Sequence, residues 1–371
     1  MSPKPSPHRT QLSDVRVLVT GGAGFIGSHI VEAFVAAGDD VILLDALLPS
    51  VHGYGALIEA PDGVETISGD VRDRTTIERA LGGVDIVCHQ AAMVGLGKYI
   101  ADLPDYVTHN DLGTAVLLAA MASAGVRNLV LASSMVVYGE GRYRCTVDGI
   151  VRATPREAGD LAAGLFEPRC PRCRELLALE RVEEDTAPDP RNVYAVTKVA
   201  QEFLASSWAR ETSSGVRALR YHNVYGPRMP RDTPYAGVAA LFRSELAAGR
   251  PPRVFEDGRQ LRDFVHVTDV ARANVLASRS QRREFRAYNI ASGTPCTIGE
   301  VATALASAAD GPPPITTGEY RLGDVRHIVA DPTRARDELN FSADVMWPEG
   351  IREFASHPMR APATDKRFAH T

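Results

Sequence analysis

Tyr194 and Lys198 are four residues apart in a segment with a helical pattern, Tyr194-Ala-Val-Thr-Lys-Val-Ala-Gln-Glu-Phe-Leu204. In a helix this spacing places both side chains on one face. An ammonium group one turn from a phenol lowers the phenol pKa, which is ordinarily about 10, so the pair predicts a base that takes a proton from a hydroxyl group. The same spacing is also common on solvated helix faces, so the prediction depends on the elements around the pair.

Near the N-terminus, a glycine-rich turn separates a predicted strand from a predicted helix. The apolar run over residues 15–19 is typical of a buried parallel strand, and a helical apolar pattern covers residues 26–37. The turn holds Gly21, Gly22, Gly24 and Gly27, of which the last three fit G-x-G-x-x-G. Such a turn lets the backbone approach a pyrophosphate at the helix N-terminus, so it predicts a dinucleotide-binding βαβ unit.

A second predicted strand, over residues 41–45, ends in Asp45. The number of residues from Gly27 to Asp45 is close to the roughly 20 expected for the acid that holds the adenosine ribose hydroxyls. A plain turn residue at a strand end is the alternative interpretation. A carboxylate here would repel a 2′-phosphate, so the pattern favours NAD over NADP.

Length and composition narrow the class of protein. A chain of 371 residues with 44% apolar residues is enough for one large α/β domain with a smaller lobe. No apolar run approaches the roughly 18 residues that span a membrane, and the first residues lack the apolar segment of a secretory signal. The net charge of −5 argues against a nucleic-acid surface. We expect a cytoplasmic enzyme that binds neither membrane nor nucleic acid.

Strand and helix patterns alternate through the first half of the chain. Strands are expected over 64–70, 85–92 and 128–134, with helices over 74–81 and 103–124. Apolar strands joined by helices predict a parallel sheet covered on both faces, a doubly wound Rossmann-type α/β fold. Ligands of such sheets lie beyond the C-terminal strand ends. The candidate cofactor contacts at these ends are Asp70, Ala91 and Ala92.

The pattern also suggests domain boundaries. We expect a disordered lead-in over 1–13, an NAD-binding domain over 14–220, an interleaved substrate-binding lobe over 221–355 and a disordered tail over 356–371. Within the first domain, residues 139–190 break the alternation. This segment, called the insert below, is rich in Arg, Glu, Pro and Gly and holds three of the five cysteines.

Further motifs follow in order along the chain. They are Thr20-Gly-Gly-Ala-Gly-Phe-Ile-Gly-Ser28, Gly69-Asp-Val-Arg-Asp73, His89-Gln-Ala-Ala92, Asn110 in Asn-Asp-Leu-Gly-Thr, Ser133-Ser134 before Val137-Tyr-Gly139, Tyr194-x-x-x-Lys198, Arg220-Tyr-His-Asn-Val-Tyr-Gly-Pro-Arg228, Arg262-Asp-Phe-Val-His-Val-Thr-Asp269, Tyr288-Asn-Ile-Ala-Ser-Gly293 and Arg321-Leu-Gly-Asp324. Over residues 14–345 the sequence resembles the extended short-chain dehydrogenase/reductases, the nucleotide-sugar epimerases and dehydratases.

This resemblance implies roles for individual residues. Tyr194 is the catalytic base, Lys198 supports it and bonds the nicotinamide ribose, and Ser134 bonds the reacting oxygen, with Ser133 as the competing choice. The implied cofactor contacts are Gly21, Gly24, Phe25, Ile26, Gly27, Asp45, Asp70, Val71, Gln90, Ala91, Ala92, Asn110, Tyr194 and Lys198. The implied substrate contacts are Ser134, Asn223, Arg262, Arg321 and Asp324, with the arginines on the diphosphate and residues 235–242 near the base.

The residues after Ser134 separate two reactions of the family. Dehydratases carry an Asp-Glu pair there, whereas this chain has Met135 and Val136, which can neither protonate a leaving hydroxyl nor abstract a proton. The resemblance then implies a 4-epimerase, in which hydride leaves C4 for NAD and returns to the opposite face of a 4-keto sugar. The helices over 103–124 and 194–210 resemble the family's dimer interface, so a homodimer is expected.

Substrate identity follows from three stretches, over 132–145, 167–173 and 251–263, which most resemble 4-epimerases that act on dTDP-L-rhamnose. They imply conversion of dTDP-L-rhamnose to dTDP-6-deoxy-L-talose. A UDP-hexose or UDP-uronate 4-epimerase is the alternative. A 4-keto-sugar reductase would prefer NADPH, which Asp45 disfavours. A non-catalytic NAD-binding sensor is a further alternative, but such a protein would not need the catalytic residues that this chain carries.

The cysteines of the insert suggest a metal. Cys170-x-x-Cys173 has the spacing of half a structural zinc site, and Cys145 with Asp148 could supply the other half. Asp148 departs from the Cys/His pair of the resembling enzymes. The alternative is three reduced thiols in a surface excursion, because five cysteines in so long a chain do not make a disulfide scaffold. With few large apolar side chains, the insert is expected to have little core unless zinc holds it.

Overall fold

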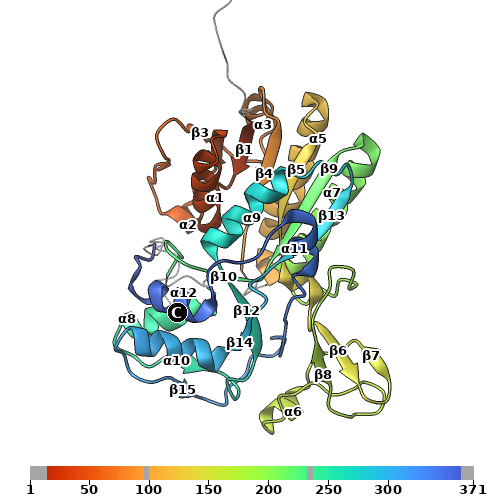
Figure 1. Cartoon of the computed structure of the whole chain (residues 1–371), viewed down its shortest axis with the longest axis vertical. Coiled ribbons are helices and arrows are strands. Elements are labelled where there is room, and N and C mark those ends of the chain that lie inside the picture. The colour runs from red at the N-terminus through yellow and green to blue at the C-terminus, as the bar shows by residue number, and fades with distance from the viewer. Residues whose placement is uncertain (1–14, 96–99, 232–236, 361–371) are drawn as a thin grey trace, which may run out of the picture.

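The computed structural model describes residues 15–95, 100–231 and 237–360 (Figure 1). The predicted lead-in, the first residues of the 235–242 segment and the last part of the predicted tail lie outside these ranges. Among the described residues, none of the helices is long and apolar enough to cross a membrane.

A seven-stranded parallel sheet forms the centre of the structure, with the order β13-β9-β5-β4-β1-β2-β3. The strands are β1 (Arg16–Thr20), β2 (Asp40–Asp45), β3 (Glu65–Ser68), β4 (Ile86–His89), β5 (Asn128–Ser134), β9 (Gly215–Tyr221) and β13 (Phe285–Ile290). The strand order reverses between β1 and β4, where doubly wound sheets bind their ligands. The predicted Rossmann-type fold is therefore confirmed.

Helices cover both faces of this sheet (Figure 1). On one face lie α1 (Phe25–Ala36), α9 (Val267–Ser278) and α11 (Thr333–Leu339), and on the other lie α3 (Arg74–Ala80), α5 (Gly113–Ala124) and α7 (Val193–Thr212). Along β1, Val17 and Val19 belong to the first core and Leu18 to the second. The strands are apolar throughout because successive side chains enter opposite cores.

The helix predicted over 103–124 is not regular. It begins as α4 (Leu103–Tyr106), continues as a π-helical stretch η2 (Val107–Leu112) and becomes α5 at Gly113. Such stretches are rare and frequent at functional sites. Here it carries Asn110, whose side chain is fully buried.

A smaller group of elements packs around a separate apolar core. It contains β10 (Asn223–Tyr225), β12 (Leu261–His266) and β14 (Pro295–Thr297) in one sheet, β11 (Arg253–Val254) paired with β15 (Ile315–Thr316), and the helices α8 (Val238–Ala247), α10 (Ile298–Ala308) and α12 (Trp347–Ser356). Figure 1 places this group below the central sheet. Because α9, β13 and α11 pack with the central sheet, the chain passes between the two groups more than once.

The insert folds as a three-stranded antiparallel sheet, β7-β6-β8, at the lower right of Figure 1. Its elements are β6 (Arg142–Cys145), β7 (Gly149–Val151), α6 (Ala158–Ala162) and β8 (Ala178–Glu180). Six buried side chains pack together inside it: Tyr143, Cys145, Val151, Ala153, Cys170 and Leu177. The insert thus has a small core of its own, more than its composition predicted.

The described end of the chain also differs from the predicted disordered tail. The backbone N–H of Arg360 donates to the carbonyl of Met229 at 3.1 Å, and its guanidinium donates to the carbonyl of Ala23 at 2.9 Å. The first bond joins the last described residue to the chain after β10 (Asn223–Tyr225), and the second joins it to the glycine-rich turn.

Candidate active site

The glycine-rich turn packs too closely for other residues. Gly21 has φ +68°, and a Cβ on it would lie 2.6 Å from the backbone N of Ala91 at the end of β4. A Cβ on Gly27 would lie 2.1 Å from the carbonyl oxygen of Gly21. The glycines therefore fix the approach of the turn to both the sheet and α1, as a dinucleotide-binding turn requires.

The turn and the end of β2 fit a dinucleotide. The N-cap of α1, Gly24, offers no side-chain hydrogen bond, so the first backbone N–H groups of the helix can bind a pyrophosphate. The carboxylate of Asp45 accepts from the backbone N–H groups of Ala23, at 3.0 Å, and Leu47, at 2.8 Å. Each carboxylate oxygen keeps acceptor capacity for a ribose hydroxyl.

Three predicted cofactor residues bind other parts of the chain. Both oxygens of Asp70 accept from the guanidinium of Arg72, at 2.9 and 2.7 Å. The side-chain amide of Asn110 exchanges two hydrogen bonds with the backbone of Met93 and donates to the hydroxyl of Thr197. Both amide hydrogens of Asn110 are therefore used.

Gln90 donates to Asn274 and accepts from Tyr221, so its amide is also engaged. Asn110 and Gln90 therefore position the ends of β4 and α7. The sequence motif alone could not distinguish this structural role from contact with the cofactor. Among the other predicted cofactor residues, Val71 is buried, and Ala91 and Ala92 are half-buried at the end of β4.

The three predicted catalytic side chains meet where β5 ends and α7 begins. Asn192 caps α7 by accepting from the backbone N–H of Ala195 at 2.9 Å, which places Tyr194 in the first turn. The hydroxyl groups of Ser134 and Tyr194 are hydrogen-bonded to each other. The ammonium group of Lys198 donates to the carbonyl of Ala132 at 2.9 Å and lies 5.8 Å from the centre of the Tyr194 ring.

In the protein alone, the pKa of Tyr194 differs from the sequence prediction, and the pKa of Lys198 is also shifted. Burial raises the pKa of Tyr194 to about 12, although the hydrogen bond from Ser134 opposes this rise. Burial lowers the pKa of Lys198 to about 8, against the attraction of Glu202 and Asp111. Desolvation therefore outweighs the hydrogen bond from Ser134, and the phenol pKa is raised where the sequence prediction had it lowered.

Ser133 and Ser134, the two candidates for the serine, have different surroundings. Ser133 is buried and donates to the carboxylate of Glu202, one turn after Lys198. Glu202 also forms a buried two-bond ion pair with Arg220, at 2.9 and 2.7 Å. Ser134 is half-buried and is hydrogen-bonded to Tyr194, so it is the serine that lies beside the predicted base. The sequence prediction missed this buried network behind the site.

The predicted substrate contacts lie on β10, β12 and the loop over 317–327. The side-chain oxygen of Asn223 is buried and, within the described ranges, has no hydrogen-bond partner. Arg321 is exposed, with its guanidinium 5.1 Å from the centre of the Phe255 ring. Burial raises the pKa of the Asp324 carboxyl, although Arg321 and Arg262 oppose this.

Arg262 departs from its predicted role. Its guanidinium donates to the carbonyl groups of Leu261, Val325 and Arg326 at 2.7 to 2.9 Å. Two of its five N–H donors are thus used to hold the backbone of the 317–327 loop, and a third binds the preceding residue on β12. In this structure Arg262 shapes the loop, whereas Arg321 is exposed beside Phe255.

The metal candidates of the insert come together. Cys145, Asp148, Cys170 and Cys173 each bring one ligand atom to a group in which all lie within 4.8 Å of one another. The sulfur atoms of Cys145 and Cys173 are 3.4 Å apart, and Asp148 lies 3.2 Å from the sulfur of Cys170. A Zn–S bond of about 2.3 Å implies roughly 3.8 Å between sulfur ligands of a tetrahedral site, so the donor set fits zinc.

Comparison with known proteins assigns the family. The profile of the NAD dependent epimerase/dehydratase family matches residues 17–155 and 174–291, and the chain belongs to this family. The unmatched residues 156–173 lie inside the insert. The predicted family is confirmed.

Individual relatives are similar over nearly the whole chain. A dTDP-L-rhamnose 4-epimerase of Burkholderia thailandensis is 31% identical over 91% of this chain and 93% of its own length. A UDP-glucose 4-epimerase of Mycolicibacterium smegmatis is 32% identical over 91% and 96%. The crystal structure of a Thermus thermophilus UDP-glucose 4-epimerase in complex with NAD has a TM-score of 0.74 and 33% identity, over 92% of this chain and 98% of that one. The predicted class, an NAD-dependent epimerase, is confirmed, and the relatives carry different sugars in their names.

Proposed function

We propose that the protein is a 4-epimerase that interconverts dTDP-L-rhamnose and dTDP-6-deoxy-L-talose with NAD. The observation that carries the proposal is the meeting of Ser134, Tyr194 and Lys198 at the C-terminal end of β5. The similarity to the Burkholderia epimerase supports this sugar. The substrate of the two UDP-glucose 4-epimerases supports a UDP-hexose as the second candidate.

In this proposal each of the three side chains has a task. Tyr194 takes the proton of the C4 hydroxyl and later returns it, and Ser134 holds the same oxygen. Lys198 keeps a positive charge near the phenol and, with the Ala132 carbonyl as its anchor, cannot swing away. Bound NAD supplies a hydride acceptor for C4 and then the hydride donor to the opposite face of the sugar.

Epimerisation also requires that the 4-keto sugar turns over. Strong contacts to the sugar would oppose this, so the nucleotide end must carry the affinity. Met135 and Val136 begin the 3₁₀ turn η3 (Met135–Tyr138), directly after Ser134. These apolar side chains offer the sugar no hydrogen bond and provide no acid or base for water loss.

The first experiment identifies substrate and cofactor together. Purified protein is incubated with dTDP-, UDP- and GDP-sugars without added cofactor, and NAD(H) is measured after denaturation. We expect interconversion of the dTDP-sugar and bound NAD(H), because the cofactor ends each cycle unchanged. Asp45→Ala should lose bound NAD(H), whereas Asp62→Ala, at an exposed position, should retain it. Bound NADP(H) would favour a reductase.

We also propose that the thiolates of Cys145, Cys170 and Cys173, with Asp148, hold a structural zinc ion. Metal analysis of protein purified without chelator should give close to one zinc per chain. Cys170→Ser should lose the metal, and Cys296→Ala, a buried cysteine in the smaller core, should keep it. A zinc-free wild type with full activity would contradict this proposal.

A homodimer is proposed from the surface of two helices. Large apolar side chains are exposed on η2 and α7, among them Val107, Leu112, Val196 and Phe203, the last with 65% of its surface exposed. Light scattering at micromolar concentration should give a dimer. Phe203→Glu should shift it toward monomer, whereas Leu57→Glu, exposed elsewhere, should not. A monomeric wild type would contradict the proposal.

A further inference from the structure

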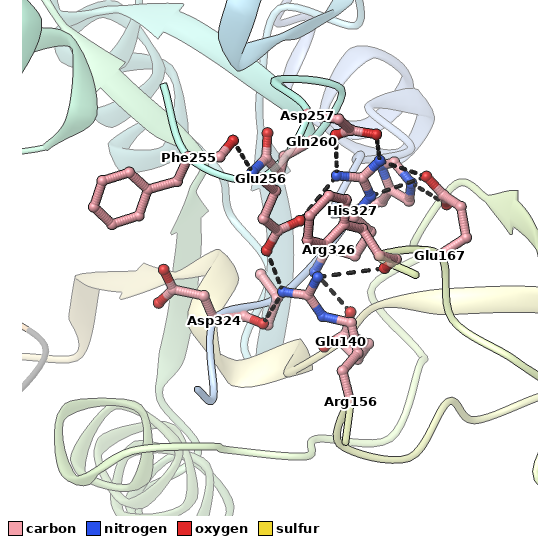
Figure 2. Close-up of polar contacts among 12 residues, drawn as sticks. Glu140, Arg156, Glu167, Phe255, Glu256, Asp257, Gln260, Asp324, Arg326 and His327 are labelled. Atoms are coloured by element: carbon pink, nitrogen blue, oxygen red, sulfur yellow. Dashed lines mark hydrogen bonds and ion pairs between the residues drawn. The ribbon is translucent and has the colours of Figure 1, made fainter. Parts of the chain in front are cut away.

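Arg326 joins the insert to the smaller lobe. Its guanidinium is fully buried and donates to three carboxylates (Figure 2). Glu167 comes from the insert, at 2.9 Å from Nε, while Glu256 and Asp257 follow β11, at 2.9 and 2.7 Å from the same terminal nitrogen. A buried arginine with charged partners from separate segments holds those segments in one arrangement.

A second arginine, Arg156, crosses the same boundary from the insert. One terminal nitrogen donates to the backbone carbonyl of Asp324 at 2.7 Å and lies 2.8 Å from Glu256. Its other terminal nitrogen donates to the carbonyl of Phe166 at 3.3 Å. The side chains of Arg156 and Glu256 are only 5% and 3% exposed, so water weakens this pair little. The insert therefore binds the backbone of Asp324, a candidate substrate residue.

Glu167 has one further partner in the loop. Its second oxygen lies 2.9 Å from Nε2 of His327, whose Nδ1 accepts from the backbone N–H of Leu261 at 3.0 Å. Since Nδ1 accepts, Nε2 carries the proton and donates it to Glu167. Burial opposes ionisation of Glu167, but hydrogen bonds from His327 and Arg326 overcome it and lower its pKa to about 2. Glu167 thus binds the side chains of two consecutive residues of the loop, Arg326 and His327.

The position of Glu167 depends in turn on the cysteine group. Directly after it, the backbone N–H of Cys170 donates to Glu175 at 2.8 Å, and that of Leu177 donates to Pro168 at 3.1 Å. This narrow turn carries Cys170 and Cys173, which face Cys145 on β6. A metal bound there would tie the turn to the sheet of the insert and so hold Glu167 in place.

We propose that the insert positions the nucleotide-binding loop over residues 321–327, so that zinc on the cysteine group raises the affinity for the nucleotide, with Glu167 as the positioning residue. The inference rests on the proposed function, because it takes the loop as the nucleotide site. The coupling is reciprocal: bound nucleotide must raise the affinity for zinc by the same factor.

Glu167→Gln is the informative substitution. It keeps the size of the side chain and leaves Arg326 paired with Glu256 and Asp257, so no uncompensated buried charge results. Glu157→Gln is the matched control, because Glu157 lies in the same insert with its side chain 73% exposed. Cys170→Ser removes the metal ligand without touching the loop.

The test uses NAD-loaded, full-length protein and calorimetric titration with dTDP and, separately, UDP. We expect Glu167→Gln and Cys170→Ser each to weaken nucleotide binding about tenfold, as is typical of coupling between sites. The double variant should bind no more weakly than either single variant. Glu157→Gln should match the wild type, and bound NAD(H) should be equal in all. For the sugar substrate, KM should rise while kcat stays unchanged.

Different outcomes separate the two proposals. Wild-type affinity in Glu167→Gln, or additive losses in the double variant, would overturn the positioning role while leaving the epimerase assignment intact. A wild type that binds neither nucleotide would overturn the proposed function and the inference with it. If Cys170→Ser does not fold, removal of zinc from the wild type and from Glu167→Gln by a chelator gives the same comparison.

Discussion

Tyr194→Phe is expected to lower turnover about 10²- to 10⁴-fold, the range by which a positioned acid–base group contributes. The substitution removes only the hydroxyl that is bonded to Ser134, and the ring keeps its contact with Tyr106 at 6.4 Å between centres. The proton of the C4 hydroxyl then has no acceptor on this side chain. The rate is measured by sugar interconversion, with bound NAD(H) as a check on folding.

Tyr54→Phe is the control for this experiment. Tyr54 is 69% exposed and lies outside the catalytic group. It should turn over at the wild-type rate. Near-normal turnover of Tyr194→Phe would remove Tyr194 from the catalytic role.

Arg220→Met is expected to reduce the free energy of unfolding by about 3–5 kcal/mol, the cost of leaving one member of a buried ion pair alone. The side chains of Arg220 and Glu202 are each 6% exposed. Arg220 also donates to the hydroxyl of Tyr138 and the carbonyl of Glu184, both at 2.8 Å. Its loss therefore leaves several buried acceptors without a donor. Chemical denaturation of the NAD-loaded protein measures the change.

The matched control removes a surface pair of similar geometry. Arg74 lies 2.6 Å from Glu78, but these side chains are 66% and 48% exposed. Arg74→Met should cost at most about 1 kcal/mol, because water screens exposed pairs. Equal losses of unfolding free energy in the two variants would show that the buried pair contributes no more to stability than the exposed pair.

Local steric rules explain why the cofactor turn could be predicted. Gly27 is dictated by a contact within its own βαβ unit and Gly21 by the neighbouring strand end at Ala91, and the strands were recognisable because both of their faces are buried. Tyr194 and Lys198 are fixed relative to each other by a single helix turn. Such relative positions can be predicted because they follow from the periodicity of a single helix or strand.

Contacts between distant segments could not be predicted in this way. Glu167 and Arg326 are separated by 159 residues, and no motif links them. Arg262 matched a diphosphate-binding position, yet two of its donors hold carbonyl groups that only the folded loop brings within reach. A guanidinium satisfies either partner equally well, so residue type alone does not decide between them.

The bond between Arg360 and Ala23 has a consequence for biosynthesis. These residues are 337 positions apart, and the chain emerges from the ribosome at about 5–20 residues per second, so roughly 20 to 70 seconds separate their appearance. During that interval the glycine-rich turn has been translated but lacks its C-terminal partner. The nascent chain therefore completes the cofactor turn only after codon 360 has been translated, and a ribosome that stalls before that codon leaves the turn open.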